Sequence, residues 1–256
     1  MNRFDGARAF ADLRYQVETI GPRPTGSPGA AKLRSWARRK LPRVRTITAK
    51  GNIRSLEGRI PGRKPAILVA AHYDTKIDIE GFVGAEDGAG GTAAVLELAR
   101  VLRRTKRPAG APEIRFVLFD GEECPDDTQP FYSCGLRGSR PYARRYAKEL
   151  RAAIVLDFIA QKDLAIPRDE SSNPRLWSRL RAAAGRVGSG AVFPDRTQPT
   201  ILDDHTPFLH AGVPAIDLID FDFPCWHKAC DDLSVVSARS LDLSGEAVLE
   251  LLRTWR

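Results

Sequence analysis

The stretch AILVAAHYDT, residues 66–75, decides the fold of this chain. Its apolar run AILVAA has no polar alternation, which is typical of a strand that is covered on both faces. His72 follows that run directly. Three further apolar runs lead into side chains that can bind a metal, namely EIRFVLFDGEE (113–123), AAIVLDFI (152–159) and PAIDLIDFDFPCWH (214–227). Because ligands of open α/β sheets bind outside the carboxyl ends of the strands, the pattern predicts one polar crevice and a metalloenzyme.

Segments with helical periodicity alternate with these strands. Residues 5–20 carry apolar side chains at helical spacing, and Ser27 with Pro28 marks the start of a second helix, over 28–41. Two β-rich runs that follow it predict a hairpin. Strands that alternate with helices predict α/β layering with a largely parallel sheet. The hairpin strands are expected at 44–49 and 52–60, and the further helices at 92–104, 140–151, 174–186 and 237–254.

Length and composition indicate one compact domain over residues 1–256. With 43% hydrophobic residues, the chain can bury a sizeable core, and no apolar run approaches the roughly 20 residues of a membrane span. Basic residues are crowded in 32–45 and 100–108, where they alternate with apolar ones as on a solvated helix face. Despite the net charge of +8, we therefore expect no nucleic-acid partner.

The start of the chain lacks the apolar stretch of a secretory signal. We expect either a cytoplasmic protein or, if a signal segment was removed, a secreted or periplasmic one. The four cysteines have no C-x-x-C spacing, which argues against a cysteine zinc site. Cys124 and Cys134 flank one polar loop, and the sequence leaves open whether they form a disulfide or remain free thiols.

Convergence of the strand ends would bring several carboxylates together. Asp87, in GAEDGAGG just before a helix, would then lie near Glu123 and Asp157. Two carboxylates about 4 Å apart repel by roughly 4 kcal/mol at an effective dielectric of about 20, and a divalent cation would relieve this repulsion. Imidazoles and carboxylates together suit zinc. In extended backbone the neighbours Glu122 and Glu123 point in opposite directions, so one can bind the metal while the other carries protons.

Each of these motifs taken singly also has a purely structural interpretation. An isolated HYD is typical of a histidine in a strand-end turn, an isolated GEE of a solvated turn, and His227 beside Trp226 of ordinary packing. Asp157 in a buried strand is harder to explain in this way, because an unpaired buried carboxylate is costly, although it could cap a loop. The joint pattern, in order and at strand ends, favours a metal site.

The segment DDHTPFLHAGVP, residues 203–214, predicts a turn into a short helix. Asp203, Asp204 and His205 stand at its start, where carboxylates interact favourably with a helix N-terminus. Capping and a role in orienting ligands or substrate both remain open for these three residues. For His210 we expect a structural role.

In this order, the motifs HYDT, GAEDGAGGTAAVLELA, FDGEE, GLRGS, LDFI, DDHTPFLHAGVPAIDLI and WH resemble metallopeptidase family 28, which contains zinc aminopeptidases and the animal-type glutaminyl-peptide cyclotransferases. The resemblance runs from about Gly21 to Leu241. It implies a single three-layer α/β domain with a mixed, mainly parallel central sheet flanked by helices. It also implies a cis peptide after Asp87. By motif match, the zinc positions are His72, Asp87, Glu123, Asp157 and His227, and Glu122 is the general acid/base.

The two branches of the family imply different metal counts. In the aminopeptidases the five matching positions hold two zinc ions with Asp87 as the bridge. In the cyclotransferases one zinc is held at the positions of Asp87, Glu123 and His227, and Asp157 belongs to a hydrogen-bond relay. His72 is then either a ligand of a second zinc or a group that orients the ligands. We favour one zinc and leave two open.

Three features resemble the cyclotransferase branch: HYDTK, the long insertion CPDDTQPFYSCGLRGS, and DDHTPFL followed by FPCWH. Asp203 then matches a catalytic aspartate, and Trp226 and Phe223 match the substrate pocket. GAEDGAGG is closer to the aminopeptidases, and the insertion lacks a tryptophan that the animal cyclotransferases have, with Asp126, Asp127 and Thr128 around that position. The favoured hypothesis is a zinc-dependent, monomeric glutaminyl cyclase that acts on peptide or protein N-termini, and the alternative is a zinc aminopeptidase.

Overall fold

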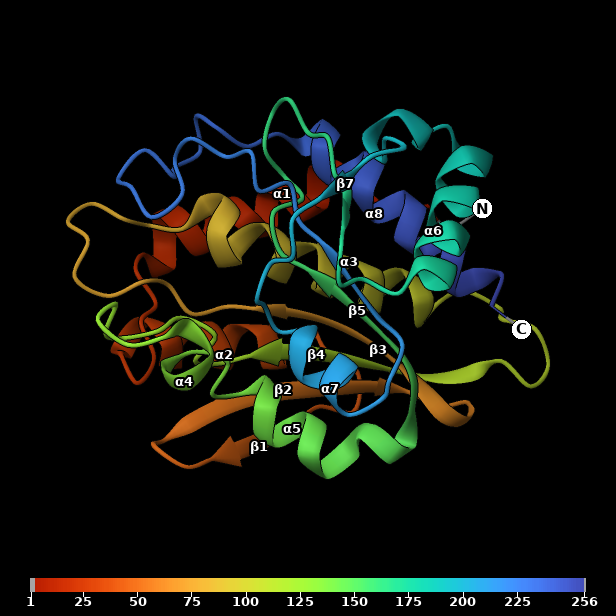
Figure 1. Cartoon of the computed structure of the whole chain (residues 1–256), viewed down its shortest axis with the longest axis horizontal. Helices are drawn as coiled ribbons and strands as arrows, with labels where there is room; N and C mark the ends of the chain where they lie inside the picture. The colour runs from red at the N-terminus through yellow and green to blue at the C-terminus, as the bar shows by residue number, and fades with distance from the viewer. Residues whose placement is uncertain (1–2, 256) are drawn as a thin grey trace.

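A six-stranded sheet forms the centre of the structure, a computed structural model that describes residues 3–255 (Figure 1). The strand order is β1-β2-β4-β3-β5-β8. Strands β4, β3, β5 and β8 are mutually parallel, and the hairpin of β1 and β2 joins antiparallel at the β4 side. The predicted three-layer α/β fold with a mixed, mainly parallel sheet is therefore confirmed. The strands are β1 Arg45–Ala49, β2 Ile53–Ile60, β3 Arg63–His72, β4 Pro112–Phe119, β5 Leu150–Leu156 and β8 Ala215–Leu218.

Both faces of the sheet are buried, as the unbroken apolar run of β3 predicts. Ile67, Val69 and Ala71 pack into one hydrophobic core, while the alternating residues Leu68 and Ala70 pack into a second core on the opposite face. A strand between two cores has no solvent-facing side, so its sequence shows no polar alternation.

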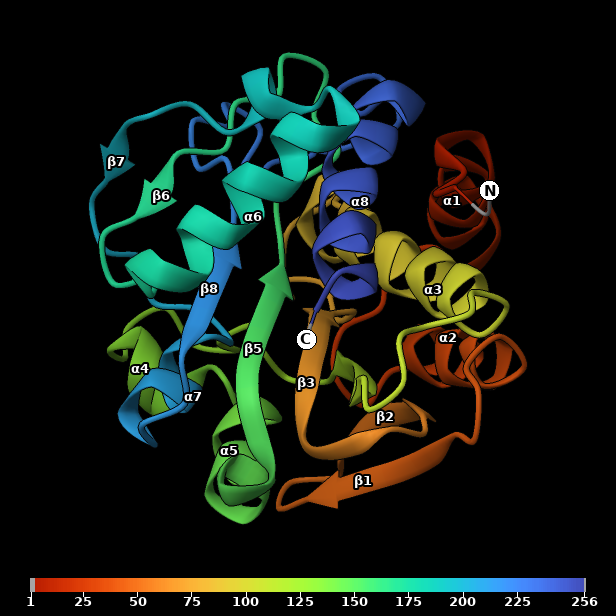
Figure 2. The ribbon, with the colours of Figure 1, turned by 90° about the vertical axis from the view of Figure 1, so that its right-hand side faces the viewer.

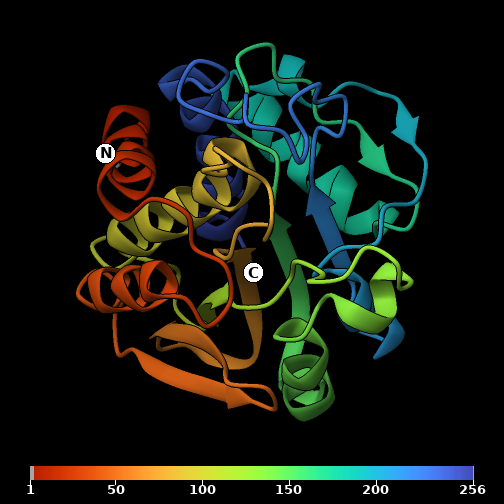
Figure 3. The same cartoon turned by 90° about the vertical axis from the view of Figure 1, so that its left-hand side faces the viewer.

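Helices cover the sheet unequally, as Figures 2 and 3 show from two sides. The larger core lies under α1, α2, α3, α6 and α8, whereas α5 and α7 pack on the smaller one. The helices are α1 Gly6–Tyr15, α2 Pro28–Arg38, α3 Gly91–Leu102, α4 Phe131–Cys134, α5 Ser139–Tyr146, α6 Pro174–Val187, α7 Thr206–His210 and α8 Ala238–Arg253; a small second sheet pairs β6 Arg168–Asp169 with β7 Thr197–Gln198.

Local capping explains several helix boundaries. The side chain of Ser27 accepts a hydrogen bond from the amide of Ala30, as its predicted N-cap role requires, and Ser237 caps α8 in the same way. At the C-terminal end of α6, Gly188 takes a left-handed conformation (φ +81°), which ends the helix.

One predicted helix is too long. The stretch 140–151 was expected to be helical throughout, but α5 ends at Tyr146, and Leu150 and Arg151 already belong to β5. Leu150 pairs with Ala66 of β3 and is buried in the smaller core. Tertiary pairing with the sheet overrides the helical spacing there.

Candidate metal centre and active site

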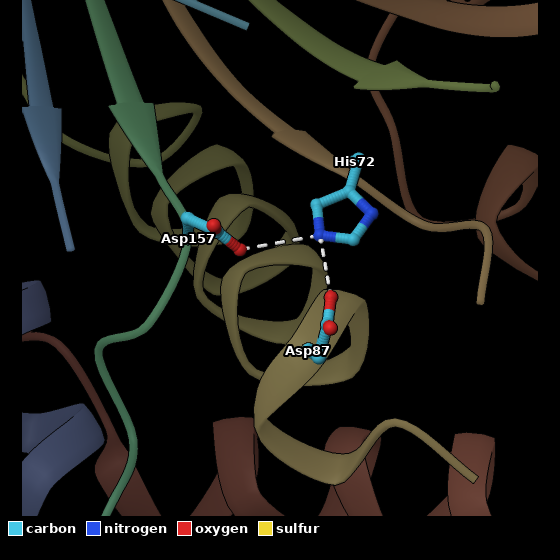
Figure 4. A group of neighbouring side chains, drawn as sticks. All are labelled: His72, Asp87 and Asp157. Atoms are coloured by element: carbon cyan, nitrogen blue, oxygen red, sulfur yellow. Dashed lines mark hydrogen bonds and ion pairs between the residues drawn. The ribbon is translucent and has the colours of Figure 1, made fainter. Parts of the chain in front are cut away.

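The carboxyl ends of β3 and β5 place a histidine and an aspartate side by side. His72 is the last residue of β3, and Asp157 follows β5 directly. Nε2 of His72 lies 3.2 Å from a carboxylate oxygen of Asp157 and 3.2 Å from one of Asp87 (Figure 4). The three residues are buried, and their ligand atoms lie within 4.8 Å of one another. This buried His–Asp–Asp group can bind a metal ion.

Hydrogen bonding on the far side of His72 fits a metal ligand. Nδ1 lies 3.1 Å from the backbone carbonyl oxygen of Asp74. Since a carbonyl oxygen only accepts, Nδ1 must carry the proton in this hydrogen bond. That tautomer directs the lone pair of Nε2 toward Asp87 and Asp157, which is the usual arrangement of a metal-binding histidine.

A second group shares Asp87 with the first. Nε2 of His227 lies 3.3 Å from an oxygen of Glu123 and 3.5 Å from the second carboxylate oxygen of Asp87. Asp87 thus presents one oxygen to His72 and the other to His227. The other oxygen of Glu123 is buried and has no hydrogen-bond partner among residues 3–255, so a cation would satisfy an otherwise orphaned acceptor.

Two aspartates that the sequence analysis missed hold the backbone of these ligands. Asp231 accepts hydrogen bonds from the amides of Glu86 and Asp87, at 2.7 and 3.1 Å. Asp74 accepts from the amides of Glu122 and Glu123, both at 3.2 Å. Asp74 lies in the quoted HYDT motif, but its contact with the GEE segment 48 residues away could be found only in three dimensions.

The backbone after Asp87 differs from the expected one. Lys64–Pro65 is the cis peptide bond of the described residues, so the predicted cis bond after Asp87 is wrong. Instead, Gly88 turns the chain through a positive φ of +96°. A Cβ there would lie 3.2 Å from Cε1 of His72 and 3.0 Å from the carbonyl oxygen of Asp74. Glycine is required at this position by both conformation and space.

Burial and mutual repulsion favour protonation of the acids in this region. Burial, with the charge of Asp203 added, raises the pKa of Asp157 to about 8. Burial and the neighbouring Asp87 raise the pKa of Glu123 to about 7. For His72, burial acts to lower the pKa, but the carboxylates of Asp157, Asp74 and Asp87 outweigh it and raise the pKa well above its ordinary value. A divalent cation would compete with these protons for the same atoms.

A cavity of about 490 Å³ opens over both groups. Glu122 lines it, and burial raises the pKa of this carboxyl group well above its ordinary value. Asp157, Asp203 and Trp226 line the same cavity. Phe223 is buried and packs edge-on against Phe158, which itself lines the cavity, so it supports the wall rather than forming it. Phe221 stacks on Phe158 and also lines the cavity.

A buried polar cluster lies behind Asp203. Ligand atoms of Asp203, His205 and Asp217 lie within 4.8 Å of one another, and all three side chains are buried. Nε2 of His205 lies 2.8 Å from the hydroxyl of Ser171. His205, the N-cap residue of α7, makes no capping hydrogen bond through its side chain, whereas the carboxylate of Asp203 accepts a hydrogen bond from the amide of Asp204 just before the helix. His210 lies outside the cluster, with its ring 3.0 Å from the hydroxyl of Tyr132.

Two disulfides and one lysine hold the segments around Glu123 and His227. Cys124 pairs with Cys134, and Cys225 pairs with Cys230 across the segment that contains Trp226 and His227. Of the two alternatives that the sequence left open for Cys124 and Cys134, the structure therefore has the disulfide. The buried ammonium group of Lys76 donates to the carbonyl of Cys124 and to Asp127, and it lies 3.9 Å from Glu123. These contacts of Lys76 were not predicted from the sequence.

Fold and site together define an α/β protein with a buried histidine–carboxylate centre that can bind metal, at the carboxyl edge of a mainly parallel sheet. The sequence model of Peptidase family M28 matches residues 53–252. The chain belongs to this family, which confirms the resemblance drawn from the motifs. Among the described residues, no helix is both long enough and apolar enough to cross a membrane.

Individual known proteins are similar to this chain in sequence or in fold. A glutaminyl-peptide cyclotransferase of Drosophila melanogaster is 28% identical in an alignment of 211 residues that covers 71% of this chain and 59% of the relative. One of Bothrops jararaca is 29% identical in an alignment that covers 71% of this chain and 60% of the relative. The chain thus spans about three fifths of the length of these curated relatives. The solved structure of an Acidobacteriales bacterium glutaminyl cyclase matches with a TM-score of 0.86 and 32% identity, over 98% of this chain and 94% of the other. A leucine aminopeptidase precursor from Bacteroides thetaiotaomicron has a TM-score of 0.89 at 24% identity and covers 99% of this chain and 98% of that one, a likeness of fold alone.

Proposed function

We propose that the protein is a glutaminyl-peptide cyclotransferase, which converts an N-terminal glutamine of a peptide into pyroglutamate and releases ammonia. The observation that carries this proposal is the 32% identity to a glutaminyl cyclase over 98% of the chain. The cavity supports it as well, because five buried acids line it together with aromatic side chains. A concave, partly apolar pocket of this kind can receive the N-terminal glutamine of a peptide.

The residues that would hold a zinc ion are Asp87, Glu123 and His227, which share one set of facing ligand atoms. Their donor set of one imidazole and two carboxylates fits zinc. When bound, zinc would supply a Lewis acid that polarises the side-chain amide carbonyl of the substrate. In this arrangement His72 and Asp157 orient the ligands and the proton path.

Proton transfer is assigned to Glu122. Its carboxylate takes a proton from the substrate α-amine as the nitrogen forms a bond to the side-chain carbonyl carbon. The same proton then goes to the leaving amide nitrogen, which departs as ammonia when its carbon–nitrogen bond breaks. Asp157 and Asp203 line the cavity beside Glu122 and keep the proton in this region. Trp226 covers the glutamine side chain, and Phe223 supports that wall from behind.

A second candidate, an aminopeptidase, is favoured by one specific observation. All five ligand positions are present, and Asp87 directs one oxygen to each of two histidines. Two metal-binding groups that share one residue suit a two-metal hydrolytic centre. In this alternative His72 and Asp157 would help to hold a second zinc, and Glu122 takes a proton from the attacking water as the first peptide bond is cleaved.

The two candidates differ in their products. Zinc-loaded protein is incubated in parallel with a glutamine-initiated and a leucine-initiated peptide of otherwise identical sequence. We expect ammonia and a pyroglutamyl product from the first peptide and no free leucine from the second. Release of leucine without ammonia would replace the cyclotransferase with the aminopeptidase, and a chain that binds no zinc would contradict both.

Disulfides form and persist in oxidising compartments. Because the structure has two of them, we also propose that the protein is periplasmic or secreted. Protein isolated from such a compartment without reductant would carry no reactive thiol in a denaturing thiol titration. A titration that finds four thiols would place the protein in a reducing compartment.

A further inference from the structure

A cavity of about 460 Å³ lies between α2 and the hairpin of β1 and β2, which are neighbours in both side views (Figures 2 and 3). Its volume falls in the range of roughly 300–1,000 Å³ that is typical of ligand sites. It shares no lining residue with the cavity over the metal centre, and no carboxylate of the described chain lines it. Its polar lining residues are three arginines and three hydroxyl-bearing residues, namely Arg34, Arg38, Arg54, Ser35, Thr46 and Thr48.

Local structure brings these side chains to one place. Arg34 and Arg38 are separated by one turn of α2. On the hairpin, Thr48 pairs directly with Arg54, and Thr46 lies two residues away on the same face. The guanidinium group of Arg38 donates to the hydroxyl of Thr46 at 3.3 Å, which joins the helix to the hairpin. Because like charges four residues apart destabilise a helix, an anion between these groups would relieve their repulsion.

The three arginines are poorly balanced by acids. The side chain of Arg34 is 14% exposed, donates to the hydroxyl of Tyr73 at 2.8 Å and lies 3.8 Å from a carboxylate oxygen of Asp120. The hydrogen bond of Arg38 goes to a neutral hydroxyl, and neither Arg38 nor Arg54 forms an ion pair with a carboxylate of residues 3–255. Arg34 is thus held in place, while two further positive charges have no acidic partner.

A basic cavity nearby differs in this respect. It is lined by Arg39, Lys40 and Arg100 among others, but acids are part of its wall. Lys40 pairs with Asp12 at 2.9 Å, and Arg100 pairs with Glu97. Crowded basic residues in the sequence therefore do not distinguish the two places, whereas the partners of their side chains do.

We propose that the cavity between α2 and the β1–β2 hairpin binds an oxyanion of the phosphate class, either free in solution or in a lipid headgroup. Guanidinium groups match pairs of phosphate oxygens, and the hydroxyls of Thr46, Thr48 and Ser35 donate to the remaining ones. A carboxylate has fewer oxygens and a single charge, so it would satisfy fewer of these donors. The proposal does not depend on the reaction proposed above, because the two cavities share no residue.

Calorimetric titration of the full, zinc-loaded chain with inorganic phosphate tests the site. We expect Arg38→Gln/Arg54→Gln to weaken phosphate binding by at least about tenfold, because each lost guanidinium removes charge-assisted hydrogen bonds. This variant keeps Arg34, so the contacts that join α2 to the sheet are retained. Arg144→Gln/Arg175→Gln is the matched control: it removes the same charge at two exposed positions outside the cavity, and its affinity should stay close to that of the wild type.

A second arm distinguishes the two sources of the phosphate group. Flotation of the chain with phosphatidylcholine vesicles is compared with and without phosphatidic acid. Binding of free phosphate indicates a soluble ligand, whereas binding only to the phosphatidic acid vesicles indicates a lipid headgroup. Either result supports the site when Arg38→Gln/Arg54→Gln weakens it and the control variant does not.

Three results would overturn the proposal. The first is a wild type that binds neither phosphate nor the acidic vesicles. The second is an equal loss of binding in both double variants, which would show a response to net charge alone. The third is phosphate binding that survives in Arg38→Gln/Arg54→Gln but is lost in His227→Ala, because such binding belongs to the metal centre.

Discussion

The pKa values of acidic residues are shifted in opposite directions at the two ends of the parallel strands. At the carboxyl ends, burial raises the pKa of Asp157 to about 8 and that of Glu123 to about 7. At the other end, Glu149 pairs with Arg115 and Lys64, and these hydrogen bonds lower its pKa to about 2. Acids that pair with basic side chains stabilise the fold. Acids that lie close together despite their mutual repulsion indicate a site that binds a ligand. The contrast locates the functional edge of the sheet.

The largest effect is expected at Glu122. Glutamine in its place keeps the size and shape of the side chain but cannot take up a proton, so Glu122→Gln should lower kcat by about 1,000-fold. Zinc content should stay unchanged, because Glu122 is not assigned as a ligand. Ammonia release and metal analysis on the same preparation check both statements. Glu80→Gln, at an exposed position, is the matched control, and a Glu122→Gln enzyme within tenfold of the wild type would contradict the assignment.

The two histidines distinguish one metal ion from two. With a single zinc at Asp87, Glu123 and His227, His227→Ala should weaken zinc binding by more than about 100-fold. His72→Ala should weaken it only by about tenfold, as expected for a group that orients ligands. Competition with a chelator and metal content after dialysis measure both values. A wild type with two zinc ions, of which each variant loses one, would instead support the two-zinc alternative. If His72→Ala weakened zinc binding more than His227→Ala, the single ion would belong to the group of His72, Asp87 and Asp157.

A smaller effect is expected from the two disulfides. The Cys225–Cys230 bond restrains the short segment with Trp226 and His227, so replacing both cysteines by serine should weaken zinc binding by about tenfold. The Cys124–Cys134 bond instead restrains a loop with Asp127, Gln129 and Phe131 in the cavity wall, so its double serine variant should raise KM and leave zinc affinity near that of the wild type. If both double variants bound zinc as tightly as the wild type, neither bond would preorganise the ligands.

The smallest effect lies at the opposite end of the sheet. Glu149→Gln should cost about 1 kcal/mol or less at pH 7, because solvent screens an ion pair whose carboxylate is 37% exposed. The pKa of Glu149 is lowered in the folded state from 4.5 to about 2. Its contribution is therefore complete above about pH 4.5 and is lost as the pH falls through about 2. Urea unfolding of variant and wild type at pH 7 and pH 2.5 measures this, and a difference that grows in acid would refute the pairing.

Most of the candidate site could be predicted from the sequence, because strand ends carry a clear signal. An apolar run that leads into His72 or Asp157 can be read from residue order alone, and parallel strands bring such ends to one edge of the sheet. The contacts of Asp74, Asp231 and Lys76 were missed for a different reason. These side chains bind backbone groups of distant segments, and no spacing in the sequence encodes such a partner.

Sequence alone determined the layering of this protein, the residue types of its centre and the family motifs, because apolar periodicity follows directly from which faces are buried. Three other features could be seen only in the folded chain: Asp87 directs one oxygen to each histidine, α5 ends at Tyr146, and Phe223 lies behind Phe158. These features depend on the packing of segments far apart in the chain, and packing is fixed by the shape of the whole core rather than by any local pattern.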